Sequence, residues 1–156
     1  MRMIRVHQEQ IPQALRLREA VLREVCGLGE GYAFAADFAL ATAAYLRRED
    51  QTTLLMLDAS GEAVACATLC YLTLLPTFDH PTGKRAHLMN VYTAPEHRRQ
   101  GLSLRLVEAL MQEALQRGVT EISLDAAPAG RPLYRSLGFA ENEEGMVWHP
   151  MRRNEA

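Results

Sequence analysis

The fold is decided by one stretch, which reads Val91-Tyr92-Thr93-Ala94-Pro95-Glu96-His97-Arg98-Arg99-Gln100-Gly101-Leu102-Ser103. Residues 86–93, which run into this stretch, have the pattern of a strand. The apolar residues at its end and beyond recur at helical spacing: Leu102, Leu106, Val107, Leu110, Met111, Ala114 and Leu115. Gly118 is placed to cap the end of this helix. Gly101 lets the main chain approach a ligand closely, and the first amides of a helix have no partner inside that helix. The stretch therefore predicts a strand-to-helix junction that suits an anion such as a diphosphate.

The segments on either side of this junction predict the rest of the sheet. Before it, alternating or apolar runs indicate strands over 2–6, 52–57 and 63–69, and helical patterns cover 11–25 and 37–48. After it, we expect a strand over 121–125, a short helix over 131–137 ended by Gly138, and a final strand over 146–148. This order predicts an α/β fold with a largely antiparallel sheet, in which the unit around the junction is the parallel crossover.

Size and composition favour one globular domain over residues 1–156, because 48% of the residues are hydrophobic and 23% are charged. A formal net charge of −2 argues against nucleic acid as a partner. Apolar runs stay well short of the roughly 20 residues that a membrane helix needs, and the first residues lack the apolar core of an export signal. We therefore expect no membrane partner and a cytoplasmic location.

Two further groups of residues have ordinary explanations. The cysteines, Cys26, Cys66 and Cys70, are odd in number and lack paired spacing, which argues against a disulfide framework and against a zinc cluster. We assign Cys66 and Cys70 to the core and expect no metal. The glycine-rich stretch 27–32 could cradle a phosphate, but no strand precedes it and no Lys-Ser pair ends it, so a loop forming a lid over an acceptor is favoured.

The stretch from Arg98 to Ser103 resembles the pyrophosphate loop of the GCN5-related N-acetyltransferase superfamily, written R/Q-x-x-G-x-G/A, although Ser103 stands where the family usually has Gly or Ala. A second block resembles the family's distal motif and reads Arg131-Pro132-Leu133-Tyr134-Arg135-Ser136-Leu137-Gly138-Phe139. Taken alone, the first block could be a helix start with solvated arginines, and Tyr134 could be a core tyrosine. Both blocks in the family's order extend the resemblance over nearly the whole chain.

The resemblance implies a mixed, largely antiparallel sheet of six to seven strands with about four helices, whose fourth and fifth strands separate to form a cofactor cleft. It implies acetyl-CoA as cosubstrate, held by the main chain of Val91, Tyr92 and Thr93. It also implies that the pyrophosphate is bound by the loop and helix start: Arg98, Arg99, Gln100, Gly101, Leu102 and Ser103. A neutral amine would attack the thioester directly in a ternary complex, and Tyr134 matches the tyrosine that protonates the departing thiolate.

The resemblance leaves the base and the acceptor open. Five residues near the strand ends are candidate bases: His87, Asn90, Glu96, His97 and Asp125. The carboxylate that relatives often carry on strand 4 is missing from 86–90, and Ala127 stands where many relatives have a polar cofactor contact.

The acceptor is expected to be a primary amine of a small molecule or peptide. The alternatives are a non-catalytic acyl-CoA-binding regulatory module and a protein N-terminal or lysine acetyltransferase. A homodimer paired through the edge of a final strand containing Trp148 is also expected.

Overall fold

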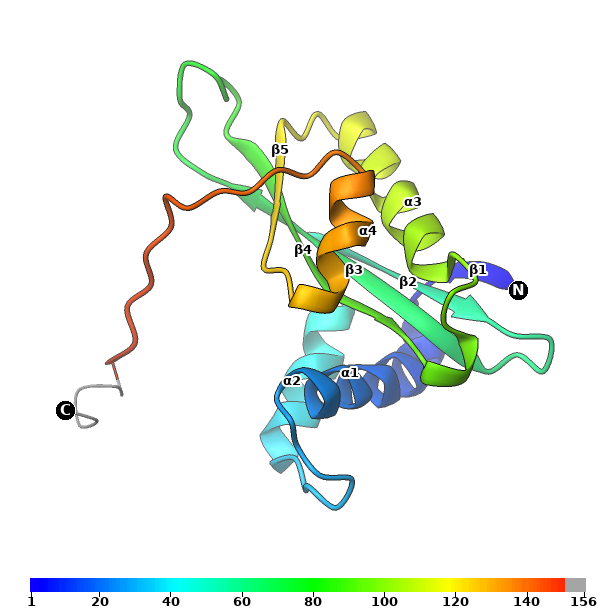
Figure 1. Ribbon diagram of the computed structural model, residues 1–156. Helices are drawn as coiled ribbons and strands as arrows, with labels where there is room; N and C mark the ends of the chain where they lie inside the picture. The colour runs from blue at the N-terminus through cyan, green and yellow to red at the C-terminus, as the bar shows by residue number, and fades with distance from the viewer. Residues whose placement is uncertain (151–156) are drawn as a thin grey trace.

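A computed structural model describes residues 1–150 and contains one five-stranded sheet in the order β1-β2-β3-β4-β5 (Figure 1). The strands are β1 (Arg2–Arg5), β2 (Gln51–Leu57), β3 (Ala63–Thr73), β4 (Lys84–Thr93) and β5 (Glu121–Leu124). Neighbouring strands run antiparallel except β4 and β5, which run parallel. The predicted parallel crossover through the junction is therefore confirmed.

Four α-helices cover the two faces of this sheet (Figure 1). The helices α1 (Ile11–Val25) and α2 (Ala36–Leu46) pack on one face, and α3 (Leu102–Gln116) and α4 (Arg131–Ser136) on the other. Short 3-10 turns stand at 8–10, 95–97 and 128–130. The predicted end of α3 is confirmed, since Gly118 adopts a positive φ of 76° immediately after the last helical turn.

Helices on both faces explain why β2 and the first seven residues of β3 are buried on both sides. Every residue of β2 is buried, and successive side chains alternate between two core clusters. Met56 belongs to the cluster under α3, with Leu69, Leu106 and Leu110, whereas Leu55 belongs to the cluster under α1. Such a two-sided core fixes β3 and β4 in position between the helical layers.

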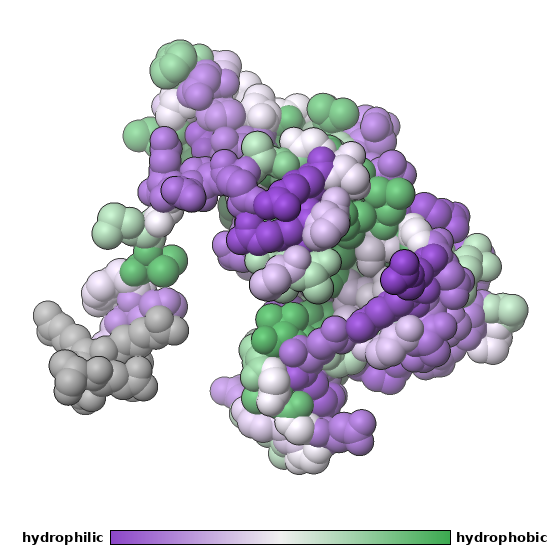
Figure 2. Space-filling view, in the orientation of Figure 1, coloured by the Kyte–Doolittle hydropathy of each residue, from purple (hydrophilic) through white to green (hydrophobic). Residues whose placement is uncertain are grey.

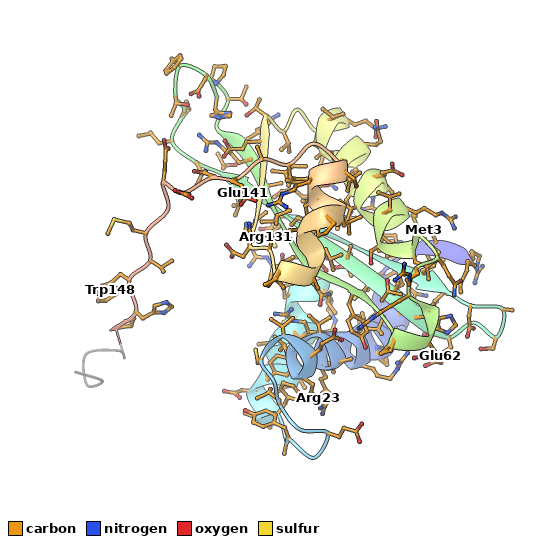
Figure 3. All side chains as sticks on the ribbon, viewed as in Figure 1. Met3, Arg23, Glu62, Arg131, Glu141 and Trp148 are labelled. Atoms are coloured by element: carbon orange, nitrogen blue, oxygen red, sulfur yellow. The ribbon has the colours of Figure 1, made fainter. Side chains whose placement is uncertain are left out.

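The prediction of six to seven strands is wrong for the described residues, which form five. The final strand expected at 146–148 is absent from the described structure, and Met146, Val147 and Trp148 are 98%, 86% and 81% exposed (Figures 2 and 3). A strand requires a partner ladder, and within residues 1–150 this segment pairs with none. The homodimer expected through that strand stays a prediction.

After α4 the chain leaves the sheet. Arg131 and Arg135 both contact the carboxylate of Glu141, at 2.6 and 2.7 Å (Figure 3). These ion pairs tie the chain back to α4, and the following residues run away from the sheet as an extended segment (Figure 1).

The prediction that Cys66 and Cys70 both lie in the core is confirmed only for Cys66. Cys66 is completely buried between the sheet and α1. Cys70 is only partly buried, because it lies toward the end of β3 beside the Tyr45 hydroxyl, 2.6 Å from its sulfur. Separately, none of the helices within 1–150 combines the length and the apolar character needed to cross a membrane.

Candidate functional site

The site begins where β4 loses one of its two neighbours. On the β3 side, β4 is paired along most of its length. On the β5 side, pairing runs only from Arg85↔Glu121 to Leu88↔Leu124, because β5 ends at Leu124. Residues 89–93 therefore present main-chain groups that no described strand pairs on that side.

A β-bulge lies at the point of separation. The register between β3 and β4 passes from Thr68↔Met89 to Cys66↔Tyr92, so that two residues of β4 stand opposite Ala67. One of the two is Asn90, whose φ of 60° is in the left-handed region that asparagine tolerates better than most residues. Side-chain bonds hold it there: its amide donates to Thr68 Oγ1 at 3.2 Å, and the Cys66 thiol donates to its carbonyl oxygen at 3.2 Å.

The helix that follows β4 starts without a side-chain cap. Gly101 is its N-cap at φ 71°, and the first main-chain bond of α3 runs from Arg105 N–H to the Gly101 carbonyl at 3.1 Å. The amides of Leu102, Ser103 and Leu104 therefore precede the helical ladder. A Cβ placed on Gly101 would meet nothing within 4 Å, so the space beside the N-cap residue is open.

This donor set fits a diphosphate. Unpaired amides, the positive end of the helix dipole and an open approach are the features that bind phosphate groups at helix starts. The buried side chain of Leu102 anchors the first turn in the core below α3, while the Ser103 hydroxyl lies 2.8 Å from the Thr93 hydroxyl. The end of β4 and the start of α3 are thereby held together.

The two arginines of the junction have different environments. Arg98 Nε donates to the Thr93 carbonyl at 2.9 Å, and its Nη2 lies 2.6 Å from Glu24 of α1. Its guanidinium also stands 5.8 Å from the centre of the Tyr92 ring. Arg99 is exposed at φ 61°, and it forms no ion pair with any residue in the described range. Arg98 therefore connects the junction to α1, whereas Arg99 has no ion-pair partner among residues 1–150.

Tyr134 lies on α4, partly buried against the core cluster under α3. Its ring packs edge-on to Phe139, with centroids 6.0 Å apart, and burial raises the pKa of the Tyr134 hydroxyl. Gly130 makes room for this ring, because an added Cβ would stand 3.0 Å from Tyr134 Cε2. The hydroxyl is thus kept protonated at neutral pH in a fixed position.

The structure joins two of the five candidate bases. His87 Nδ1 lies 2.8 Å from Ser123 Oγ, and His87 Nε2 lies 3.8 Å from Asp125. Glu96 and His97 instead lie in the 3-10 turn before the junction. Sequence reasoning missed Ser123, which is identified only by its register opposite His87 across the parallel pair.

Two other positions complete the comparison with the expected site. Ala127 begins the 3-10 turn that leads to α4 and offers no side-chain donor. Sequence reasoning also missed Arg18 of α1, whose guanidinium donates to the Asn90 side-chain oxygen at 3.4 Å. Its only sequence signal was a charge between the buried positions Leu17 and Val21 of the same helix.

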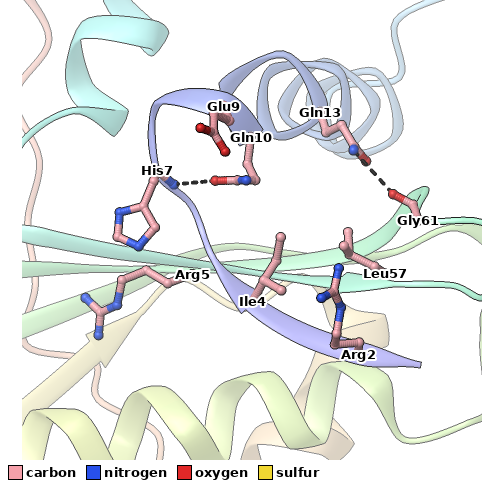
Figure 4. A pocket seen from close by; sticks show the side chains of 9 residues that line it. All are labelled: Arg2, Ile4, Arg5, His7, Glu9, Gln10, Gln13, Leu57 and Gly61. Atoms are coloured by element: carbon pink, nitrogen blue, oxygen red, sulfur yellow. Dashed lines mark hydrogen bonds between the residues drawn. The ribbon is translucent and has the colours of Figure 1, made fainter.

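Surface cavities of about 540 and 460 Å³ lie beside β1, the edge of the sheet opposite β5. The larger is lined by charged groups such as Arg2 and Glu9 together with the apolar Ile4 and Leu57 (Figure 4). Hydrogen bonds from His7 N–H to Gln10 and from Gln13 to the Gly61 carbonyl lie at its border. Neither cavity is lined by a residue of the junction.

A parallel crossover with an uncapped helix start beside a free strand edge is an α/β arrangement that suits a phosphate-bearing ligand at that junction. The model of the acetyltransferase (GNAT) family matches residues 17–139. The chain belongs to this family, because the match covers most of its length and includes both blocks quoted from the sequence. The acyl donor of the family is acetyl-CoA.

Relatives of known name are similar over part of the chain. Thialysine N-ε-acetyltransferase of Sus scrofa is 27% identical over 100 residues, which are 62% of this chain and 59% of that protein. The chloroplastic GCN5-related N-acetyltransferase 2 of Arabidopsis thaliana is 39% identical over 77 residues, or 47% of this chain and 29% of that protein. The matched region therefore spans less than two thirds of either relative.

Solved structures share the fold over almost the full length. A predicted acetyltransferase from Clostridium acetobutylicum, solved with acetyl-CoA, superimposes with a TM-score of 0.82 at 22% identity and covers 95% of both chains. A GCN5-related N-acetyltransferase from Ralstonia eutropha gives a TM-score of 0.79 at 23% identity, covering 95% of this chain and 97% of that one. At these identities the likeness establishes the fold.

Proposed function

We propose that this chain transfers the acetyl group of acetyl-CoA to a primary amine of a small molecule or peptide, which attacks directly in a ternary complex. The observation that carries the proposal is the continuity of the free half of β4 with the uncapped start of α3. An extended arm can pair with the first while its diphosphate meets the second.

Different residues would hold the two ends of the donor. The main chain of Val91, Tyr92 and Thr93 offers donors and acceptors to the pantetheine arm along the unpaired edge of β4. The amides at the start of α3 and the guanidinium of Arg99 would meet the diphosphate, while Arg98 keeps the loop in place through Glu24. When bound, acetyl-CoA supplies a thioester carbonyl that is already activated towards an amine.

Tyr134 is proposed to give its phenolic proton to the sulfur that leaves. Burial raises the pKa of its hydroxyl above the ordinary value of about 10, so the group is protonated throughout the physiological range. A thiolate with a pKa of about 8.5 leaves even when the proton is transferred late, so we expect this step to assist the reaction without being indispensable.

Thiol release from acetyl-CoA, measured against a panel of amines and short peptides, tests the proposal when combined with calorimetry of coenzyme A binding. Coenzyme A affinity together with amine-dependent thiol release supports it. Saturable binding without thiol release with any acceptor would identify a non-catalytic acyl-CoA-binding module. Activity confined to peptides would identify a protein acetyltransferase, and absence of coenzyme A binding by the folded chain would overturn the proposal altogether.

The predicted homodimer, single domain and cytoplasmic location remain predictions. Sedimentation velocity of the purified chain measures the first directly. A monomer at micromolar concentration would agree with the exposed, unpaired segment around Trp148.

A further inference from the structure

Three arginines of α1 have contrasting surroundings. Arg16 lies 2.5 Å from Glu62, and Arg23 lies 3.5 Å from Glu19 on the same helix (Figure 3). Arg18 has no carboxylate within 4 Å among residues 1–150, and its hydrogen bond to Asn90 is a long one to a neutral group. Arg18, which is partly buried, is thus the arginine of α1 without a carboxylate partner among these residues.

Burial of an unpaired guanidinium is unfavourable, and the neighbours of Arg18 do not relieve it. Desolvation lowers the pKa of Arg18. The thiol of Cys66 nearby is neutral at physiological pH, since burial raises its pKa to about 12. The carboxylate of Glu24, further along α1, forms an ion pair with Arg98. A partly buried cation without a carboxylate partner suits an anion that arrives with a ligand.

The position of Arg18 indicates which ligand that is. Its guanidinium reaches Asn90, the residue at the bulge where β4 separates from β5. It approaches from α1, on the face of the sheet opposite α3 and α4. The proposed donor site is on the neighbouring residues 91–93 of the same strand, and the α1 face is left for the acceptor. One of its five N–H donors is engaged with Asn90, which leaves a pair for an oxyanion.

We infer that Arg18 forms an anion subsite for the acceptor, so that the amine acetylated by this chain also carries a carboxylate or a phosphate. The inference rests on the proposed function and narrows its substrate class to acidic amines, such as amino acids or amino phosphates. Polycationic amines without an acidic group are correspondingly disfavoured, because they would meet the unpaired guanidinium.

Matched pairs of amines test this inference. The pairs are lysine with cadaverine, which lacks the carboxylate, and phosphoethanolamine with ethanolamine, which lacks the phosphate. We expect kcat/KM of the wild-type chain to favour the acidic member of at least one pair by about 10- to 100-fold, the range of a charge-assisted hydrogen bond. The pair that shows the preference tells a carboxylate site from a phosphate site.

The variant Arg18→Gln should abolish that preference, chiefly by raising KM for the acidic amine, while coenzyme A affinity stays unchanged. Arg16→Gln is the matched control, because it removes an exposed arginine of the same helix that already has a partner. Arg18→Lys should restore part of the preference, since it keeps the charge and loses the paired donors.

Two results would overturn the inference while leaving the acetyltransferase proposal standing: equal kcat/KM for both members of each pair, or an equal loss with acidic and neutral amines in Arg18→Gln. If Arg18→Gln does not fold, the wild-type pair ratios decide, together with competition by acetate and inorganic phosphate against the amine. Coenzyme A binding without turnover of any amine would instead refute the proposed function.

Discussion

The two halves of β4 have different roles although they belong to one strand. Residues 84–88 lie between β3 and β5, and Ala86 and Leu88 are buried against α3. Residues 89–93 keep β3 as a neighbour, contain the bulge at Asn90, and have no described partner on the other side. The half with two neighbours holds the fold together, and the half with one neighbour exposes the main chain to a ligand.

The difference arises from the length of the neighbouring strand. β5 has four residues, and the chain then turns into the 3-10 turn at 128–130. An unpaired amide is tolerated on β4 beyond that point because water or a ligand can satisfy it, whereas a buried one would be costly. A short β5 is therefore a requirement for the proposed site.

The largest expected effect tests the two halves directly. Leu88→Ala removes a buried side chain from the doubly paired half and should lower the free energy of unfolding by about 2–5 kcal/mol. Val91→Ala, in the singly paired half, removes a partly buried side chain and should cost about 1 kcal/mol or less. Urea denaturation of both variants measures the difference, and equal losses would contradict the distinction.

The fold was largely predictable because its elements carry strong local signals. The apolar spacing in 102–115 and the glycines at 118 and 138 mark helices and their ends, and all three agree with the structure. The strand at 146–148 was predicted from three apolar residues alone. Whether such a segment pairs depends on the sheet edge available to it, and local sequence does not encode that edge.

The next largest effect is expected at Tyr134, the proposed proton donor. Tyr134→Phe should lower kcat by about 100-fold, the lower end of what general acids contribute, with coenzyme A affinity unchanged. Tyr71→Phe is a control on the same face of the sheet, because that hydroxyl is bonded to Glu113 at 3.0 Å and lies outside the junction. Steady-state kinetics and calorimetry decide it, and unchanged turnover in Tyr134→Phe would remove the residue from this role.

A smaller effect is expected at the start of α3. Gly101→Ala places a side chain at φ 71° and narrows the approach to the helix amides, so coenzyme A affinity should fall about tenfold. Gly118→Ala imposes similar backbone strain, at φ 76°, on the other end of α3. Calorimetry should show weaker binding for the first variant alone. An equal loss in both would mean that strain in the helix, and not access to its amides, sets the affinity.

The site was predictable in part for a physical reason. The loop residues and Tyr134 are adjacent in sequence to their helices, so local patterns identified them. Arg18 and Ser123 depend on which elements pack together: α1 reaches Asn90 over 72 residues of sequence, and Ser123 faces His87 only through the parallel register. The periodicity of the sequence shows which face of each helix or strand is apolar. Which residues contact that face depends on how the elements pack together.

A polar cluster around Glu113 of α3 lies on the part of the sheet that contains residues 84–88 of β4. Its carboxylate accepts bonds from the Thr52 and Tyr71 hydroxyls at 2.6 and 3.0 Å, and lies 2.5 Å from Arg5 and 2.8 Å from Arg117. Tyr71 is in register with Ala86 of β4. This cluster connects α3 to β1, β2 and β3.

The smallest expected effect is on the pH dependence of stability. Desolvation would raise the pKa of Glu113, but the Thr52 and Tyr71 hydrogen bonds and the charge of Arg5 outweigh it and lower the pKa. The folded state therefore favours the ionised carboxylate. This stabilisation is present above the unfolded pKa of about 4.3 and is lost as pH falls through the lower pKa of the folded state.

Glu113→Gln should reduce the free energy of unfolding at pH 7 by about 1 kcal/mol. Between pH 7 and pH 3 it should also lose less stability than the wild type, measured by urea denaturation across that range. Identical acid profiles for the two proteins would show that the cluster does not titrate with folding, while coenzyme A binding, which depends on the other half of β4, should be the same in both.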